Sequence, residues 1–323
     1  MEMTIGRFAP SPTGRMHLGN VFCALLSWLS AKSQGGRWLL RIEDIDRQRC
    51  RRDYALLLMD DLQWLGLQWD GEPLWQSTRT DIYEHYYEML RRQGITYPCY
   101  CTRADLLASQ APHESDGRVV YPGTCRPQKK TVLSDNERNS TADSKTDDEK
   151  RPAATRLIVP DCDITFTDRN YGPQTVNLAQ HVGDFVIRRK DGAWAYQMAV
   201  VIDDALTQVT EVVRGRDLLL SAPQQIYLAR RLNLPSPTYA HHPLLCNEAG
   251  QRLSKRDCST GMDYIRQHFT PQQVIGLLAR AAGLSSDGRT VTAEELIETF
   301  SWDRVPRHDI EIAKSQIVGQ RAF

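Results

Sequence analysis

Several common sequence signatures are absent from this chain of 323 residues. No apolar run approaches the ~18–20 residues that a membrane-spanning helix needs, and the N-terminus lacks the charged-then-apolar pattern of a secretory signal. Lysine plus arginine and aspartate plus glutamate number 40 each, so no general basic field attracts nucleic acid, although a local patch would suffice. With 41% hydrophobic residues, the composition predicts a globular protein that does not contact a membrane.

Two widespread nucleotide-binding motifs are also missing. The chain contains neither the Gly-x-x-x-x-Gly-Lys-Ser/Thr loop nor the Gly-x-Gly-x-x-Gly dinucleotide fingerprint. Most of the eight cysteines stand singly, which favours free thiols in a reducing cytoplasm over a disulfide framework. Any nucleotide site must therefore use a different phosphate-binding device.

The start of the chain predicts a βαβ unit with such a device. An apolar strand over 4–8 is followed by a loop rich in proline and glycine, a helix over 21–32 and a second strand over 38–42. His17 and Gly19 would lie at the N-terminus of the helix. Free N–H groups and a partial positive charge make such a terminus a natural seat for phosphate.

A second stretch far downstream has complementary chemistry. Residues 251–257 follow a turn at Gly250 and combine basic side chains with a hydroxyl group. On a mobile loop these groups could close over a polyphosphate. The two stretches together favour a nucleoside triphosphate as ligand.

Four short motifs resemble the class I aminoacyl-tRNA synthetases. Residues 17–20 (His-Leu-Gly-Asn) resemble the first ATP motif of that family, and residues 252–256 (Arg-Leu-Ser-Lys-Arg) resemble the second. Residues 7–14 (Arg-Phe-Ala-Pro-Ser-Pro-Thr-Gly) and 41–46 (Arg-Ile-Glu-Asp-Ile-Asp) resemble its glutamyl branch. Their order and separation identify the chain as a member of this family over nearly all of residues 5–305.

The resemblance implies an α/β fold of the class I synthetase type. A Rossmann-type catalytic core with a parallel sheet would comprise residues 1–95 and 194–245. An inserted α+β subdomain with a zinc site would occupy 96–193, and the second ATP-motif loop with a helical region would occupy 246–323. Residues 129–151 are polar and nearly free of large apolar side chains, so we expect an exposed, mobile insertion without chemistry.

Two more strands are expected to complete the sheet. Residues 199–204 have the pattern of a buried parallel strand that ends in Asp203 and Asp204, and residues 210–217 have that of the next strand. Acidic groups at the carboxyl ends of parallel strands face the ligand crevice. Glu43 is such a group, and it is either a solvated acidic turn or an acceptor for a substrate ammonium. The resemblance assigns the second role.

Glutamate binding requires a cation for the side-chain carboxylate and an anion for the ammonium group. Arg7 and Arg214 lie at the crevice ends of two predicted strands, and arginine provides a bidentate clamp that lysine cannot copy. A surface salt bridge is the alternative for Arg214. The resemblance places both arginines at the substrate, with Tyr196 as a hydrogen-bonding wall. It completes the glutamate pocket with Phe8, Ala9, Pro10, Ser11 and Glu43.

The resemblance also implies attack of an amino-acid carboxylate on the α-phosphorus of ATP. The protein must then align the reactants and stabilise phosphate charge. His17, Gly19 and Asn20 would hold the triphosphate. Lys255 would neutralise the leaving pyrophosphate, with Ser254 donating a hydrogen bond beside it. Mg²⁺ is expected with ATP, although the sequence shows no carboxylate cage for it.

Three cysteines lie close together in the middle of the chain. The thiolates of Cys99, Cys101 and Cys125 could hold a structural Zn²⁺ ion, or the three could be ordinary reduced cysteines. Chemistry alone prefers His113 as the fourth ligand, because imidazole binds zinc far more often than phenolate does. The family pattern of Cys-x-Cys followed by Tyr-x-x-x-Cys points to Tyr121, with His113 in reserve.

The helical anticodon-binding domains of full glutamyl-tRNA synthetases have no counterpart in the sequence, which therefore resembles the glutamyl-Q tRNA(Asp) synthetases of this family. That resemblance implies tRNA-independent activation of L-glutamate. Glutamate is then transferred to the cyclopentenediol of queuosine in the anticodon loop of tRNA(Asp), which Asp203 and Asp204 would help to orient. We expect a cytoplasmic monomer.

Three other functions are compatible with parts of the sequence. The first is a truncated glutamyl-tRNA synthetase that charges a tRNA 3′ end. The second is a non-catalytic, synthetase-like regulator that binds RNA, which predicts broken ATP motifs. The third is specificity for glutamine, which fits a pair of arginines poorly because a neutral amide does not need two cations.

Overall fold

A computed structural model gives the fold of this protein. It describes residues 3–102, 120–127, 152–253, 260–286, 288–313 and 315. The predicted site residues His113, Ser254 and Lys255 and the polar insertion at 129–151 lie outside this part of the chain. No helix within it is long and apolar enough to cross a membrane.

The first βαβ unit forms as predicted. Strands β1 (Ile5–Phe8) and β2 (Arg37–Ile42) are parallel neighbours, and helix α1 (Leu18–Lys32) connects them. The helix begins earlier than its apolar periodicity predicts, because His17 caps it. The short strand β3 (Leu74–Trp75) continues this sheet beyond β2, also in parallel.

A second sheet has four strands in the order β7-β6-β10-β9. Strands β6 (Asp163–Asp168) and β7 (Gly172–Asn177) form an antiparallel hairpin. Strand β10 (Thr238–His242) joins β6 to β9 (Glu211–Gly215) through parallel pairing on both sides. The N–H group just before β9 donates to a carbonyl of β1 at 2.9 Å, so β1 and β9 run side by side.

Residues 199–204 form a helix and not the predicted strand. They belong to α6 (Tyr196–Leu206), in which every residue from Met198 to Asp204 is buried. A helix that is buried on all sides has no polar face. A short apolar run in the sequence can therefore be either such a helix or a buried strand. The two acids of this run are therefore presented from a helix.

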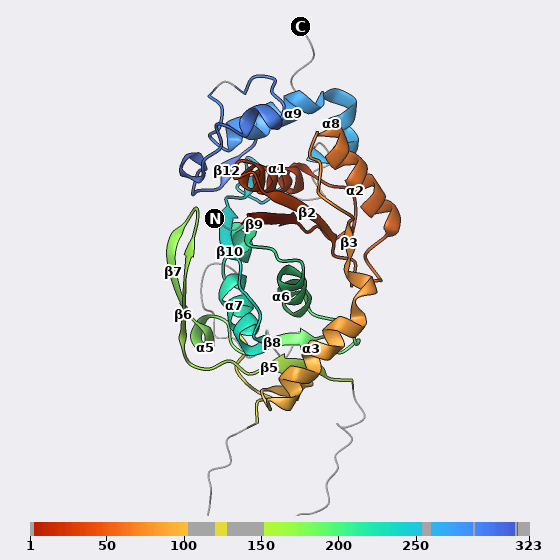
Figure 1. The fold of residues 1–323 in the computed structure, drawn as a ribbon, viewed down its shortest axis with the longest axis vertical. Coiled ribbons are helices and arrows are strands. Elements are labelled where there is room, and N and C mark those ends of the chain that lie inside the picture. The colour runs from red at the N-terminus through yellow and green to blue at the C-terminus, as the bar shows by residue number, and fades with distance from the viewer. Residues whose placement is uncertain are drawn as a thin grey trace, which may run out of the picture.

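Three amphipathic helices surround this framework: α2 (Arg52–Trp64), α3 (Thr80–Arg92) and α7 (Ser221–Leu232). Figure 1 shows α3 and α7 beside α6. The buried apolar residues form two main clusters. One joins α1 and β2 to the C-terminal helices, and the other joins α3, α6 and α7.

The inserted segment contains a small antiparallel sheet in the order β4-β5-β8. Its strands are β4 (Thr96–Cys99), β5 (Ala154–Leu157) and β8 (Phe185–Arg188). The short helix α5 (Leu178–His181) precedes β8. This sheet lies at the end of the molecule opposite the C-terminal helices (Figure 1).

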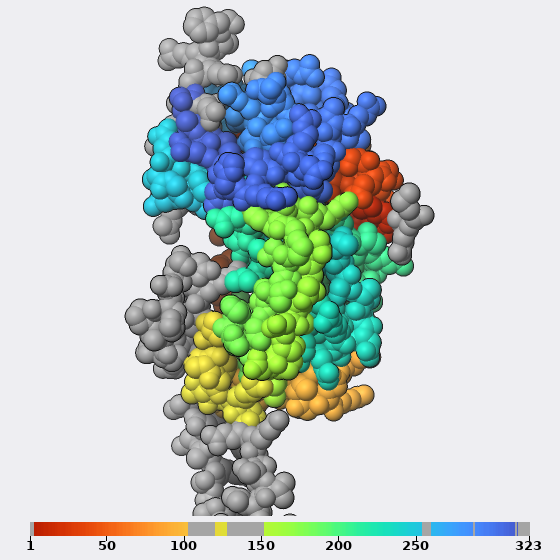
Figure 2. Space-filling view, turned by 90° about the vertical axis from the view of Figure 1, so that its left-hand side faces the viewer, coloured from red at the N-terminus to blue at the C-terminus, as the bar shows by residue number. Residues whose placement is uncertain are grey.

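The C-terminal part is mainly helical, as predicted. Helix α9 (Pro271–Ala281) follows α8 (Met262–His268), and the Thr270 side chain caps α9 by accepting from a backbone N–H group. Strand β12 (Ile310–Glu311) pairs in parallel with β11 (Leu245–Cys246), which ties this part to the core. Figure 2 shows the β6–β7 hairpin, in green, below this blue region on one face of the molecule.

Candidate active site

A cavity of about 410 Å³ lies where the carboxyl ends of β1 and β9 meet the N-terminus of α1. It brings together most of the predicted substrate-binding residues. These are Arg7, Phe8, Ala9, Pro10, Ser11, Gly19, Asn20, Glu43, Tyr196 and Arg214. His17, which was also predicted to bind ATP, is buried next to the cavity but is not one of its lining residues. Parallel strand ends are the expected place for a ligand in a sheet of this type.

The first ATP motif forms a capped helix start. His17 Nδ1 accepts from the Gly19 N–H group at 3.1 Å, and Asn20 Oδ1 accepts from the His17 N–H group at 3.1 Å. Because Nδ1 is an acceptor, a neutral His17 carries its proton on Nε2. A Cβ atom at Gly19 would lie 2.9 Å from His17 Cε1, so a larger residue there would displace the ring. The arrangement leaves the positive end of α1 facing the cavity.

The second ATP motif begins at the same cavity. Arg252 and Leu253 are its described residues, both line the cavity, and Arg252 forms an ion pair with Asp217. Where the described chain resumes, Gly261 forms a β-bridge with His17. The ends of the intervening segment are therefore both next to the first motif.

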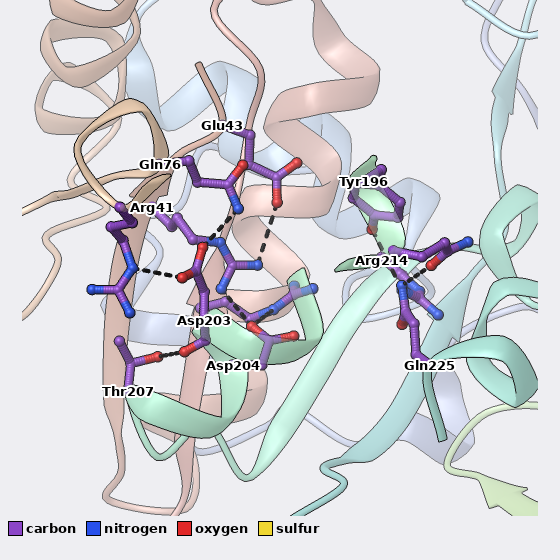
Figure 3. A network of polar contacts seen from close by, with 12 residues as sticks. Arg41, Glu43, Gln76, Tyr196, Asp203, Asp204, Thr207, Arg214 and Gln225 are labelled. Atoms are coloured by element: carbon purple, nitrogen blue, oxygen red, sulfur yellow. Dashed lines mark hydrogen bonds and ion pairs between the residues drawn. The ribbon is translucent and has the colours of Figure 1, made fainter. Parts of the chain in front are cut away.

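A buried carboxylate positions Arg7. Oδ1 of Asp204 lies 3.3 Å from Arg7 Nε and 2.5 Å from Arg41 Nη1, and Arg7 Nη1 donates to the Val213 carbonyl at 3.2 Å. Burial alone would raise the pKa of Asp204, but the charges of Arg41 and Arg7 hold it below its usual value. Asp204 is thus an ionised support for two arginines (Figure 3).

Asp203 points in a different direction from Asp204 (Figure 3). Its carboxylate accepts from Arg79 at 2.6 Å, from Tyr83 at 2.7 Å and from Gln76 at 2.8 Å. Neither acid is among the described residues that line the cavity. Both carboxylates contact protein cations or donors and neither acid lines the cavity, so the structure lends no support to the prediction that Asp203 and Asp204 orient an incoming diol.

Glu43 closes β2 and lines the cavity, as predicted. Its Oε1 lies 3.3 Å from Arg41 Nη2, and its N–H group donates to the Pro10 carbonyl at 3.0 Å. Burial raises the pKa of the Glu43 carboxyl above its usual value, although Arg41 and Arg7 oppose the shift. A ligand cation at Glu43 would offset this cost of burying the charge.

Arg214 is buried, with 4% of its surface exposed, so it does not form the surface salt bridge considered from sequence. Its Nη1 donates to Gln225 Oε1 at 2.8 Å and approaches the Tyr196 hydroxyl at 3.5 Å. Nε donates to His241 Nε2 at 3.0 Å. Nη2 is buried and has no hydrogen-bond partner among the described residues. A carboxylate oxygen would satisfy this donor.

The predicted metal ligands gather in the inserted segment, away from the cavity. The Sγ atoms of Cys99, Cys101 and Cys125 lie within 4.8 Å of one another. The Tyr121 hydroxyl lies 3.5 Å from Cys99 Sγ and 3.9 Å from Cys101 Sγ. Three thiols and a phenol around one point suit a soft divalent ion such as Zn²⁺. Arg156 Nε donates to Cys99 Sγ at 3.2 Å.

Sequence reasoning missed the residues that hold the arginines in place. The sequence marks Arg41 only as part of a motif, and it gives no prediction for Gln225 or His241. Gln225 has no distinguishing local pattern. For Arg41, a sequence signal existed, since a charged residue inside an otherwise apolar strand requires a buried counter-ion.

Parallel pairing of β1 with β2 and of β9 with β10, flanking helices, and a cavity that both short motifs line at the N-terminus of α1 are the features of a class I tRNA synthetase catalytic domain. The family model for "tRNA synthetases class I (E and Q), catalytic domain" matches residues 4–317. A glutamate tRNA ligase from Elizabethkingia meningosepticum, solved in complex with its amino acid, superposes with a TM-score of 0.78 at 29% identity. That match covers 98% of this chain and 68% of the ligase. The predicted fold class is confirmed.

Curated relatives define the family more narrowly. The glutamyl-Q tRNA(Asp) synthetase of Symbiobacterium thermophilum is 44% identical over an aligned length of 327, gaps included, and the alignment covers 98% of each chain. The protein of the same name from Thiobacillus denitrificans is 48% identical over 252 residues, or 78% of this chain and 77% of the relative. The chain belongs to the glutamyl-Q tRNA(Asp) synthetase family.

Proposed function

We propose that this protein activates L-glutamate with ATP, without tRNA, and transfers the glutamate to the queuosine cyclopentenediol in the anticodon loop of tRNA(Asp). The observation that carries the proposal is the convergence of Arg7, Arg214 and Glu43 on one cavity that reaches the N-terminus of α1. Two cations and one anion complement the two carboxylates and one ammonium of glutamate. The names of the relatives support the tRNA(Asp) acceptor.

In this proposal Arg7 and Arg214 bind the glutamate carboxylates and Glu43 binds the ammonium group. The buried Nη2 of Arg214 supports its role, because a carboxylate oxygen would complete its hydrogen bonding. Tyr196 forms a wall of the pocket beside Arg214. Phe8, Ala9, Pro10 and Ser11 shape the rest.

The triphosphate of ATP would lie at the N-terminus of α1, held by His17, Gly19 and Asn20. A glutamate carboxylate oxygen attacks the α-phosphorus, and pyrophosphate leaves. Lys255 and Ser254 would stabilise the leaving group, and Mg²⁺ accompanies ATP and offsets its charge. A diol hydroxyl then forms the ester and displaces AMP. No covalent intermediate with the protein is needed in this mechanism. The main contribution of the protein is to hold the reactants close together in the correct orientation.

We also propose that Cys99, Cys101, Tyr121 and Cys125 hold a structural Zn²⁺ ion. The close approach of the three Sγ atoms supports this set. The predicted division stands as part of the proposal, with a core at 1–95 and 194–245, an insertion at 96–193 and a helical region at 246–323. We expect the enzyme to act as a cytoplasmic monomer.

Transfer of labelled glutamate to two tRNA pools tests the function. One pool comes from cells that make queuosine and the other from cells that cannot. Label on the first pool alone, with none after K255A substitution, is the expected result. Equal label on both pools would indicate ordinary 3′ aminoacylation. No glutamate-dependent pyrophosphate exchange by the wild-type protein would instead indicate a non-catalytic RNA-binding protein.

A further inference from the structure

A chain of buried polar side chains crosses three adjacent strands behind the glutamate pocket. Asp168 ends β6, His241 lies in β10 and Arg214 lies in β9, where it is the direct register partner of His241. His241 Nδ1 lies 2.6 Å from Asp168 Oδ2, and its Nε2 lies 3.0 Å from Arg214 Nε. The side chains of Asp168 and His241 are completely buried. A polar chain in such a place needs a complete set of matched donors and acceptors.

The donor and acceptor chemistry fixes the protonation of the imidazole. The guanidinium of Arg214 can only donate, so Nε2 of His241 must offer a lone pair. The ring proton then lies on Nδ1 and is donated to Asp168. Asp168 suits this role, because its carboxylate also accepts from the N–H groups of Asn170 at 3.0 Å and Tyr171 at 2.9 Å.

The electrostatic environment agrees with a neutral ring beside an ionised acid. Burial lowers the pKa of His241, and the adjacent charge of Arg214 lowers it further, against the opposing effect of Asp168. Burial alone would raise the pKa of Asp168, but its hydrogen bonds with His241 and the backbone hold it below the usual value. A second proton on His241 would place two cations in contact in a buried site.

We propose that His241, protonated on Nδ1 and held by Asp168, is a positioning residue that fixes the guanidinium of Arg214 for glutamate. His241 holds Nε and Gln225 holds Nη1, which leaves the buried Nη2 as a guanidinium donor without a partner among the described residues. Hydrogen bonds at Nε and Nη1 hold the planar guanidinium of Arg214 rigidly. Binding of a carboxylate therefore costs little further side-chain entropy. The inference rests on the proposed role of Arg214 at glutamate.

Two substitutions of His241 separate its two hydrogen bonds. In H241N the amide reaches only the Nδ1 position, so it keeps the bond to Asp168 and loses the acceptor for Arg214. In H241Q the longer side chain places an oxygen near the Nε2 position and restores that acceptor. H85N, a change at an exposed histidine on α3, is the matched control.

Glutamate-dependent pyrophosphate exchange is the kinetic measurement. We expect H241N to raise KM for glutamate roughly tenfold, because Arg214 loses the hydrogen bond that positions its guanidinium for this substrate. KM for ATP should change by less than about twofold, because Arg214 is not proposed to bind ATP. H241Q should recover most of the loss, and H85N should match wild type. Equal KM values in H241N and wild type would overturn the inference while leaving the proposed function intact.

The tautomer can be measured without any substrate, so the inference does not depend on the enzyme being active. Long-range ¹H–¹⁵N spectra of histidine-labelled wild-type protein at pH 7, assigned by comparison with H241Q, should show a neutral His241 with its proton on Nδ1. The Leu218 backbone also lies within hydrogen-bonding reach of the ring, so the tautomer needs this direct measurement. A doubly protonated ring, or a proton on Nε2, would overturn the proposal.

Discussion

Asp204 of helix α6 and Arg41 of strand β2 form a buried ion pair, with 2.5 Å between Oδ1 and Nη1. The same oxygen lies 3.3 Å from Nε of Arg7, so one carboxylate holds cations from both long strands of the first βαβ unit. Removing one member of a buried pair leaves a charge that neither protein nor water compensates. Asp204 therefore links the stability of the fold to the geometry of the pocket.

We expect D204N to lower the free energy of unfolding by roughly 3–5 kcal/mol, because Arg7 and Arg41 lose their shared counter-ion. Urea denaturation measures the change. D191N is the matched control: Asp191 and Arg189 form an ion pair in which each side chain is 42% exposed. Its loss should change the stability by less than about 1 kcal/mol. Equal effects of the two substitutions would contradict the role given to Asp204.

Glu43 is expected to recognise the ammonium group of the substrate. Glutarate has both carboxylates of glutamate and no ammonium group, so it should inhibit the wild-type enzyme weakly. In E43Q the preference for glutamate over glutarate should shrink roughly tenfold or more, as expected for a lost charged hydrogen bond. Competition in pyrophosphate exchange measures this ratio. An unchanged preference would exclude Glu43 as the ammonium ligand.

The cysteine cluster is expected to bind zinc. Protein purified without chelator should contain roughly one zinc ion per chain, because structural sites are closed by four protein ligands. C125S should lose the metal, whereas C162S should retain it, since Cys162 lies outside the cluster. Elemental analysis of the three proteins decides the question. Zinc at background level in the wild-type protein would contradict the prediction.

His242 should make the fold sensitive to acid. Burial lowers its pKa to about 4, although the Pro243 carbonyl, which accepts from Nδ1 at 2.8 Å, opposes the shift. An unfolded histidine titrates near 6.5. As the pH falls from about 6.5 to about 4, the unfolded chain binds a proton that the folded chain does not, so up to about 3 kcal/mol of stability is lost.

Urea unfolding at several pH values between 7 and 4 measures this loss. The stability difference between wild type and H242L should shift in favour of H242L as the pH falls through that window, because leucine does not titrate. H85L, which changes an exposed histidine, should follow the wild-type curve. Parallel curves for wild type and H242L would show that His242 does not titrate abnormally.

The local chemistry of the site could be predicted from the sequence alone. A helix start and the strand ends beside it are set by short-range features, namely proline, glycine and apolar spacing. Arg7, Gly19 and Glu43 belong to such local patterns, and the structure places all three at one cavity. The cysteines of the predicted metal site also stand out in the sequence, whereas Tyr121 joined that prediction only through the family resemblance; the structure brings its hydroxyl 3.5 Å from Cys99 Sγ.

Only the tertiary structure decided what holds these residues in place. The apolar run before Asp203 and Asp204 is buried on all sides, so its periodicity could not show that it forms a helix. Asp168, His241 and Arg214 meet because β10 lies between β6 and β9. No local sequence pattern predicts this strand order. Residue types and spacings thus determined which groups gather at the cavity, whereas long-range packing determined the charges and hydrogen bonds behind them.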